Sequence, residues 1–245
     1  MKKRLAILHC PWLVAAMAMT AWLLPCVALA GGEATLMIGG DPIHVAGQAM
    51  GDGSGKATVT WRDADTVRMD VGDQNGYLLM RDGKAYSVSH HNSEVQVMDL
   101  SVMMKMMRSM GRPGAKNKSD NPFGGVDSIE ATGASETVAG IKGRVYRMHW
   151  TDGDGSRKSG HAVLTDDPLV VEMTRAYMSV MAGMVGEDTT RAFQRALPGK
   201  DHGLLRMNDQ FRVDEIHRAD SPESTFTLPA KPMDMQGLMG GMGGR

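Results

Sequence analysis

Short stretches in which apolar and polar residues alternate fill the first half of the chain after residue 30. They cover residues 34–38, 43–50, 57–62, 66–71, 77–81, 85–89 and 94–98. Alternation with a period of two places one side of a strand against a core and the other toward solvent. Between two of these stretches, Asp82-Gly83 supplies residues that tolerate the positive φ angles of a two-residue hairpin. The pattern predicts antiparallel strands joined by tight turns.

The period changes at residues 99–110, which contain no Gly or Pro and begin with Asp99, a residue that can cap a helix. At about 100° per residue, Ser101, Lys105, Arg108 and Ser109 fall on one narrow face of such a helix. The remaining apolar arc is wider than a surface helix usually carries. We therefore expect this helix to be covered on more than one side.

A second group of strands follows at residues 128–132, 143–150 and 158–165, and closing strands are expected at 204–208 and 210–217. Between them, Asp167 as cap and Pro168 in the first turn predict a helix over 169–185, and a further helix is expected over 187–197. The predicted fold class is mainly β with some helix (α+β). Residues 31–228 would form one domain, and residues 229–245, rich in Met and Gly, a flexible tail.

The N-terminal 30 residues have the pattern of a secretory signal peptide. Lys2, Lys3 and Arg4 precede an apolar stretch, and Ala28-Leu29-Ala30 supplies a small-x-small cleavage site. We expect cleavage after Ala30 and a periplasmic protein without a transmembrane span. A retained membrane anchor and lipidation at Cys26 are the alternatives.

Loss of these residues would leave 24 Lys and Arg against 28 Asp and Glu, a net charge of −4. This mildly acidic balance argues against a nucleic-acid partner. Both cysteines, Cys10 and Cys26, would leave with the signal peptide. The exported chain would then have no disulfide and no thiolate, and its stability would depend on a core.

Several pieces of the chain resemble a known group of exported bacterial proteins of unknown function. The pieces are VRMD at 67–70, GYLLMRDGKAY at 76–86, VAGIKGRVY at 138–146, and the stretch 226–229 followed by Met233-Asp234-Met235. The fold of that family resembles the periplasmic lipoprotein carriers of the LolA/LolB type. The resemblance implies a curved antiparallel sheet that forms an incomplete barrel, with two or three helices on its concave side. In the carriers that side holds acyl chains, and no catalytic residue comes with the resemblance.

Methionine is unusually frequent, with 23 residues in the chain. Its flexible thioether fills cores, lines adaptable apolar surfaces or binds soft metals such as Cu(I). We expect an apolar ligand, a lipidated protein or a partner helix to bind a cavity beneath the first two helices. Its lining would come from Leu100, Met103, Met104, Met107, Met173, Tyr177, Met181 and Met184. A core packed by the protein's own side chains, with a structural role in the envelope, is one alternative.

The other alternative is a Cu(I) or Ag(I) site built from Met103, Met104, Met106 and Met107, with His90 and His91 nearby. Met104 and Met106 lie on nearly opposite edges of the helical arc, and adjacent histidines on a strand face opposite ways, so both sets are poorly placed to share one ion. The stretch that starts at Asp152 begins like a calcium loop, but its twelfth position is Val163 rather than Glu.

Signatures of enzymes are missing from the sequence. It contains no G-x-S-x-G, no phosphate-binding loop and, beyond residue 30, no cysteine. We expect a non-enzymatic protein without a cofactor.

Overall fold

The computed structural model of the protein describes residues 31–39, 43–45, 48–50, 55–72, 75–91, 94–102, 125–151, 155–185, 187–199 and 201–233. The strands of the first half are β1 (Gly32–Ile38), β2 (Ile43–Val45), β3 (Gln48–Met50), β4 (Gly55–Asp63), β5 (Thr66–Val71), β6 (Gly76–Arg81), β7 (Lys84–His91) and β8 (Glu94–Asp99). The second half contains β9 (Gly125–Val138), β10 (Ile141–Thr151), β11 (Arg157–Thr165), α2 (Pro168–Val185), α3 (Glu187–Ala196), β12 (Gly203–Met207), β13 (Phe211–Arg218) and the 3-10 helix η1 (Glu223–Phe226).

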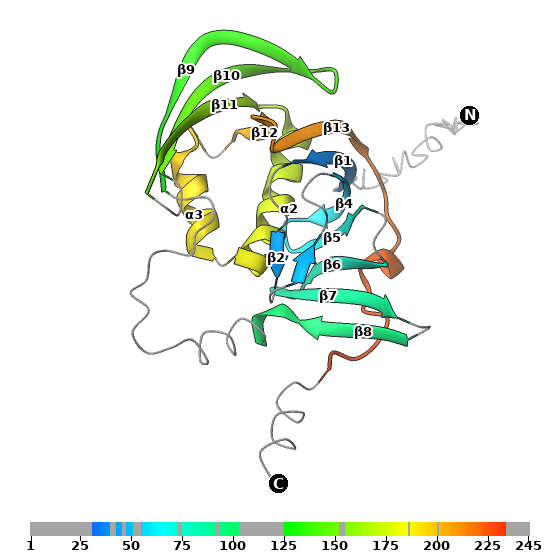
Figure 1. The fold of residues 1–245 in the computed structure, drawn as a ribbon. Helices are drawn as coiled ribbons and strands as arrows, with labels where there is room; N and C mark the ends of the chain where they lie inside the picture. The colour runs from blue at the N-terminus through cyan, green and yellow to red at the C-terminus, as the bar shows by residue number, and fades with distance from the viewer. Residues whose placement is uncertain are drawn as a thin grey trace, which may run out of the picture.

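Eleven of the strands form one antiparallel sheet in the order β8-β7-β6-β5-β4-β1-β13-β12-β11-β10-β9 (Figure 1). The sheet is not closed: within the described part of the chain, its two outermost strands, β8 and β9, do not pair with each other. The pairing of β1 with both β4 and β13 joins the two halves of the chain. The predicted class, mainly β with helices, is confirmed.

Hairpin chemistry explains most of the local pairing. Asp82 and Gly83 have φ angles of 53° and 69°, as the two central residues of a type I′ turn require. Ala139 and Gly140, with φ angles of 50° and 77°, turn the chain between β9 and β10 in the same way. The Asp82-Gly83 hairpin between β6 and β7 was predicted from the sequence, and the second turn was not.

Two strand predictions need correction. The single strand expected over residues 43–50 is wrong, because β2 and β3 are two three-residue strands that pair with each other. Alternation over eight residues does not distinguish one strand from two halves folded back on each other. The strand expected over 128–132 is the middle of β9, which has 14 residues. Gly133 (φ 81°) lies in an irregularity of the β9–β10 register, and such Gly- and Ser-rich sequence carries little strand signal.

The helix predicted over residues 169–185 is confirmed as α2. The backbone N–H groups of Leu169 and Val170 donate to Asp167 Oδ1 at 3.0 and 3.2 Å, and Pro168 occupies the first helical position. The cap predicted for the earlier helix is also present, since Asp99 Oδ1 accepts from the N–H groups of Ser101 and Val102. Residues 100–102 are helical, and residues 103–110 lie outside the described residues.

Candidate functional site

The face of the sheet that packs against α2, called the inner face here, carries the main apolar core. Its side chains include Leu36, Val59, Met69, Leu78 and Met80. α2 contacts seven consecutive strands of the sheet, from β12 through β13, β1, β4, β5 and β6 to β7. Six spacings between strands span about 29 Å, and a helix of this length is about 27 Å long. α2 therefore runs across the strands, and its length nearly matches the width of all seven.

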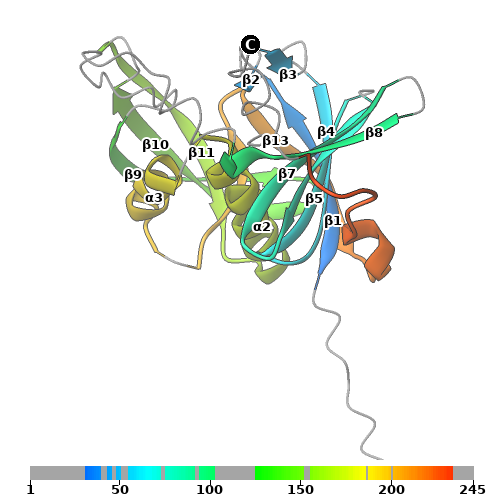
Figure 2. The same cartoon turned by 90° about the horizontal axis from the view of Figure 1, so that it is seen from below.

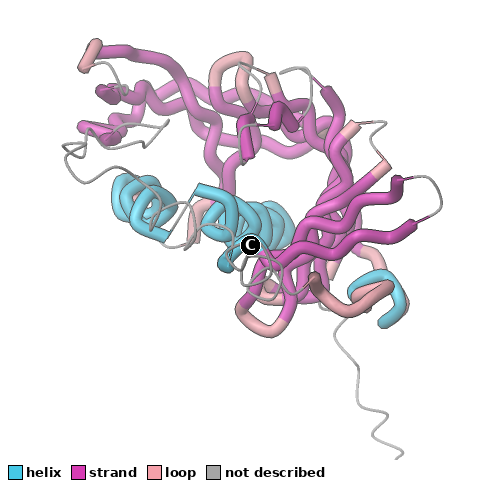
Figure 3. Tube along the Cα trace, turned by 60° about the horizontal axis from the view of Figure 1, so that its bottom comes forward, coloured by secondary structure: helices cyan, strands magenta, loops and turns pink. Residues whose placement is uncertain are grey.

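The strand register shows that α2 crosses near one end of these strands. Its first turn packs against Gly203, the first residue of β12, and Gly183 lies against Ala85, near the start of β7. Glu172 binds Arg218, the last residue of β13, through two hydrogen bonds. α3 lies beside α2 and contacts β9, so the two helices form one group (Figure 3).

Close backbone approach fixes α2 at both of its ends. A Cβ placed on Gly203 would lie 2.6 Å from the carbonyl carbon of Val170, and a Cβ on Gly183 would overlap the Cβ of Ala85. Both contacts need glycine because carbon atoms normally stay about 3.5–4.0 Å apart. Between them, the buried Thr174 hydroxyl accepts a hydrogen bond from the N–H of Leu204 at 2.8 Å.

The described part of the predicted lining comes together in one cluster. Met173, Met181 and Met184 of α2 are 0%, 3% and 7% exposed, and Leu100 is 2% exposed. All four belong to the core cluster that α2 forms with the sheet, and Tyr177 packs against it while only partly buried. These methionines therefore fill space within the protein's own core. Met103, Met104, Met106 and Met107 lie outside the described residues.

A second part of the inner face is less completely covered, and it lies at the end of the strands away from α2. Ile38 is the last residue of β1 and pairs with Phe211, the first residue of β13, which in turn pairs with Met207 at the end of β12. Val71 ends β5 at the same end of the sheet. Ile38, Val71 and Met207 are partly exposed and packed against the core. We call these residues, together with Phe211, the apolar rim.

Tyr177 connects α2 to the apolar rim. Its ring lies 5.2 Å from that of Phe211, measured between centroids. Burial raises the pKa of the Tyr177 hydroxyl to about 12, so this group stays neutral at any physiological pH. Among the described residues that were expected from the sequence to contact a ligand, Tyr177 has a ring contact with a residue of the apolar rim.

The residues of the apolar rim were not recognised in the sequence. Each of them lies at a strand end, on the inward side of an alternating stretch, so the period-two pattern does indicate that their side chains face the core. That pattern identifies which side chains face the core, but not which of them the helices leave partly exposed.

Two buried nitrogen atoms have no hydrogen-bond partner among the described residues. They are Nε1 of Trp61, which stands on β4 against Gly32, and Nδ1 of His202. The His202 ring meets that of Tyr146 edge to face, with centroids 6.4 Å apart. Each unpaired group costs about 1–3 kcal/mol relative to a hydrogen-bonded one.

The described part of the chain contains no group of three or more His, Cys, Asp or Glu side chains placed to hold an ion. His90 is exposed on β7. Val163, the residue at the twelfth position of the calcium-like stretch, is fully buried in β11. A calcium loop starting at Asp152 is therefore excluded at this position.

None of the helices in the described ranges is long and apolar enough to span a membrane. Comparison of the chain with models of protein families, with curated proteins and with solved structures gives no significant match.

Proposed function

We propose that the protein binds an apolar ligand, such as a lipid, the acyl chain of a lipidated protein or a partner helix, on the inner face of an incomplete barrel. The observation that carries this proposal is the apolar rim. Ile38, Val71 and Met207 are partly exposed at the end of the strands that α2 does not cross. Surfaces of this kind, apolar and inside a fold, are typical of sites for small apolar molecules.

The topology supports the barrel as the form of the site. An open antiparallel sheet of eleven strands has two free edge strands, β8 and β9. A helix that contacts seven neighbouring strands would cover the inner face near one end of those strands. The flexible side chains of Met207 and of Met98, which is also partly buried on the inner face, would adapt to ligands of different shape.

The start of the fold supports export to the periplasm. β1 begins at Gly32, two residues after the expected cleavage site at Ala30, and Gly31 is buried against the carbonyl of Trp61. Mass spectrometry of the exported protein should give a chain that begins at Gly31. A mass that includes residues 1–30 would contradict removal of the signal peptide.

Titration of the full chain with a fluorescent fatty acid tests the binding function. We expect saturable binding at micromolar concentrations, weakened about tenfold in Ile38→Ser, because burial of such a side chain contributes roughly 1.5 kcal/mol. Met37→Ser is the matched control: Met37 is the preceding residue and lies on the opposite face of β1, 38% exposed. No saturable binding would refute the proposal, and equal affinity in the two variants would place the ligand elsewhere.

A structural envelope protein whose core fills its own interior is the second candidate. The burial of Met173, Met181 and Met184 favours it, since these residues already contact the sheet. Absence of probe binding by the wild-type chain, together with a stable fold, would support this role.

A further inference from the structure

The chain after β13 forms a strap, residues 221–233, across the outer face of strands β5 to β8. The outer face is the one opposite α2, and it carries the apolar side chains Tyr77, Leu79, Tyr86, Val88 and Val97. Phe226 of η1 is completely buried among them, and Leu228 and Ala230 pack against the same cluster. Figures 1 and 2 show α2 and η1 on opposite sides of this part of the sheet.

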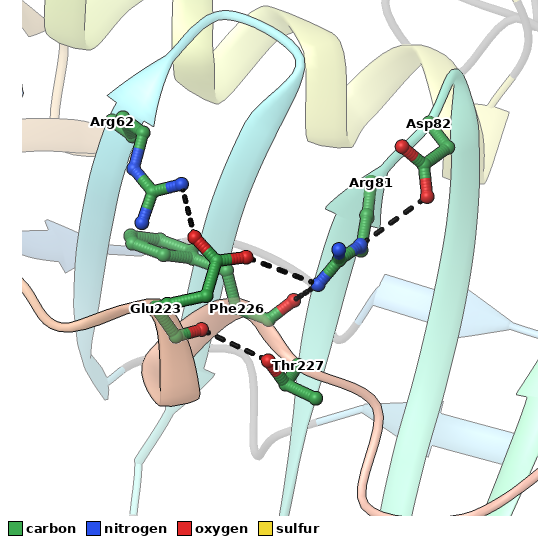
Figure 4. Close-up of polar contacts among 6 residues, drawn as sticks. All are labelled: Arg62, Arg81, Asp82, Glu223, Phe226 and Thr227. Atoms are coloured by element: carbon green, nitrogen blue, oxygen red, sulfur yellow. Dashed lines mark hydrogen bonds and ion pairs between the residues drawn. The ribbon is translucent and has the colours of Figure 1, made fainter.

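An ionic clamp holds the start of the strap. The Glu223 carboxylate accepts from Arg62 Nη1 at 2.5 Å and lies 3.5 Å from Arg81 Nη1 (Figure 4). Arg81 Nη1 also donates to the Phe226 carbonyl at 2.9 Å, and the Arg62 guanidinium lies 5.1 Å from the centre of the Phe226 ring. Arg62 is near the end of β4 and Arg81 ends β6, so the clamp ties together strands that are two positions apart.

The far end of the strap is attached to an edge of the sheet. The N–H of Met233 donates to the carbonyl of Val97 at 2.8 Å, and Val97 belongs to β8, an outermost strand. The sequence placed the start of a flexible tail at residue 229, but residues 229–233 lie along the sheet. The strap therefore spans from β4 to β8 and covers part of a strand edge that would otherwise present unpaired backbone groups.

Strand β6 lies between two layers. Tyr77 and Leu79 point outward under the strap, whereas Leu78 and Met80 point inward to the α2 side. The strap combines a buried contact, Phe226, with ion pairs that are exposed to solvent: the side chains of Arg62 and Glu223 are 38% and 61% exposed. Exposed ion pairs contribute little to stability and are screened by salt. The ion pairs are therefore the part of the strap's attachment that high salt weakens.

We propose that the strap is a latch that regulates access to the inner face. Docked, it supports β6 to β8 from the outer face; released, it lets these strands shift and so eases entry of an apolar ligand to the inner face. This inference rests on the proposed function, because it concerns entry of a ligand into the same site.

The test compares two unlatched variants with a matched control in the full chain. Glu223→Gln removes the charge that both arginines share, and Phe226→Ala removes the buried anchor. Asp214→Asn breaks an exposed ion pair, 3.3 Å from Lys56 Nζ, between β13 and β4 and away from the strap. Association of a fluorescent fatty acid is followed by stopped flow, and hydrogen exchange is followed by mass spectrometry.

We expect association to be three- to tenfold faster in Glu223→Gln and Phe226→Ala, and unchanged in Asp214→Asn. High salt should speed association to the wild-type chain more than to Glu223→Gln. Exchange should increase in β6 to β8 and in the second half of α2. If Phe226→Ala does not fold, Glu223→Gln decides the matter.

Faster exchange confined to residues 221–233, with association unchanged, would overturn the latch and leave the strap as a simple cover. Binding by the wild type and Glu223→Gln at equal rates would likewise overturn the latch alone. Absence of probe binding by every protein would overturn the proposed function and the access role with it. Binding of the probe by Glu223→Gln but not by the wild type would support both the proposed binding function and the latch.

Discussion

Replacement of Gly183 by alanine is the sharpest test of how α2 is seated on the sheet. Gly183 stands in the last turns of α2, where its missing side chain allows the helix backbone to lie against the Cβ of Ala85 on β7. In a solvent-exposed helix the same change would stabilise the protein by about 1 kcal/mol, because alanine has the higher helix propensity. Here the added methyl group would overlap Ala85.

The overlap should outweigh the gain in propensity. A Cβ atom has no side-chain torsion that could move it aside, so relief requires displacement of α2 or β7 as a whole. Overpacking of this kind costs typically about 1–3 kcal/mol, and sometimes more. With a typical cost of about 2 kcal/mol and a gain of about 1 kcal/mol from helix propensity, we expect the free energy of unfolding to fall by about 1 kcal/mol.

Urea unfolding of a double-mutant cycle measures this balance. Ala85→Gly makes room on β7, so Gly183→Ala should cost much less in that background, with a coupling energy of at least about 1 kcal/mol. Ala182→Gly, at the preceding helix position, reports helix propensity alone. A Gly183→Ala variant that is more stable than wild type, with no coupling to Ala85, would refute the close packing of α2 on β7.

Three further predictions concern capping and titration. Asp167→Ala should lower the free energy of unfolding by about 1 kcal/mol, because the N–H groups of two helix residues lose their acceptor. Asp166→Ala is the control and should have little effect; equal losses of stability in urea unfolding would contradict the cap. The hydrogen bond from Arg206 lowers the pKa of Glu136 below its ordinary value of 4.5. The Glu136–Arg206 pair therefore stabilises the fold fully above pH 4.5, and this contribution is lost as the pH falls through the lowered pKa of Glu136. The stability difference between wild type and Glu136→Gln should therefore shrink between pH 7 and pH 3, and a constant difference would argue against this pair. Burial raises the pKa of Tyr177 from 10.0 to about 12, so the neutral Tyr177 side chain stabilises the fold fully below pH 10, and this contribution is lost as the pH rises toward 12. Tyrosinate absorbance should show one group that ionises late and is missing in Tyr177→Phe. Ionisation of Tyr177 near pH 10 would contradict its burial.

Features that depend on neighbouring residues could be predicted from the sequence. The hairpin at Asp82-Gly83 and the Asp167 cap with Pro168 are encoded within four residues, and both are present. The mainly β class follows from alternation in the same way. The prediction of one strand over residues 43–50 was wrong for a related reason, since local alternation does not show where a chain reverses.

The candidate site was only partly accessible from the sequence. The helical pattern showed that Met173, Tyr177, Met181 and Met184 share one side of a helix, and the structure brings them to one cluster. It did not show that the three methionines are covered completely whereas Tyr177 lies at the less covered end. Coverage depends on where α2 crosses the strands.

The sequence by itself determined most of the segments that become strands and helices and which side of each is apolar, because propensity, capping and periodicity act between residues a few positions apart. The tertiary structure alone decided that β1 joins β4 to β13, that α2 crosses one end of the inner face, and that residues 221–233 cover the outer face of β5 to β8. These arrangements bring together residues far apart in the chain, such as Gly32 and Arg218, which pair between β1 and β13, and Arg62 and Glu223, which are 161 positions apart. Burial and close packing select such contacts over the whole molecule, and no local pattern specifies them.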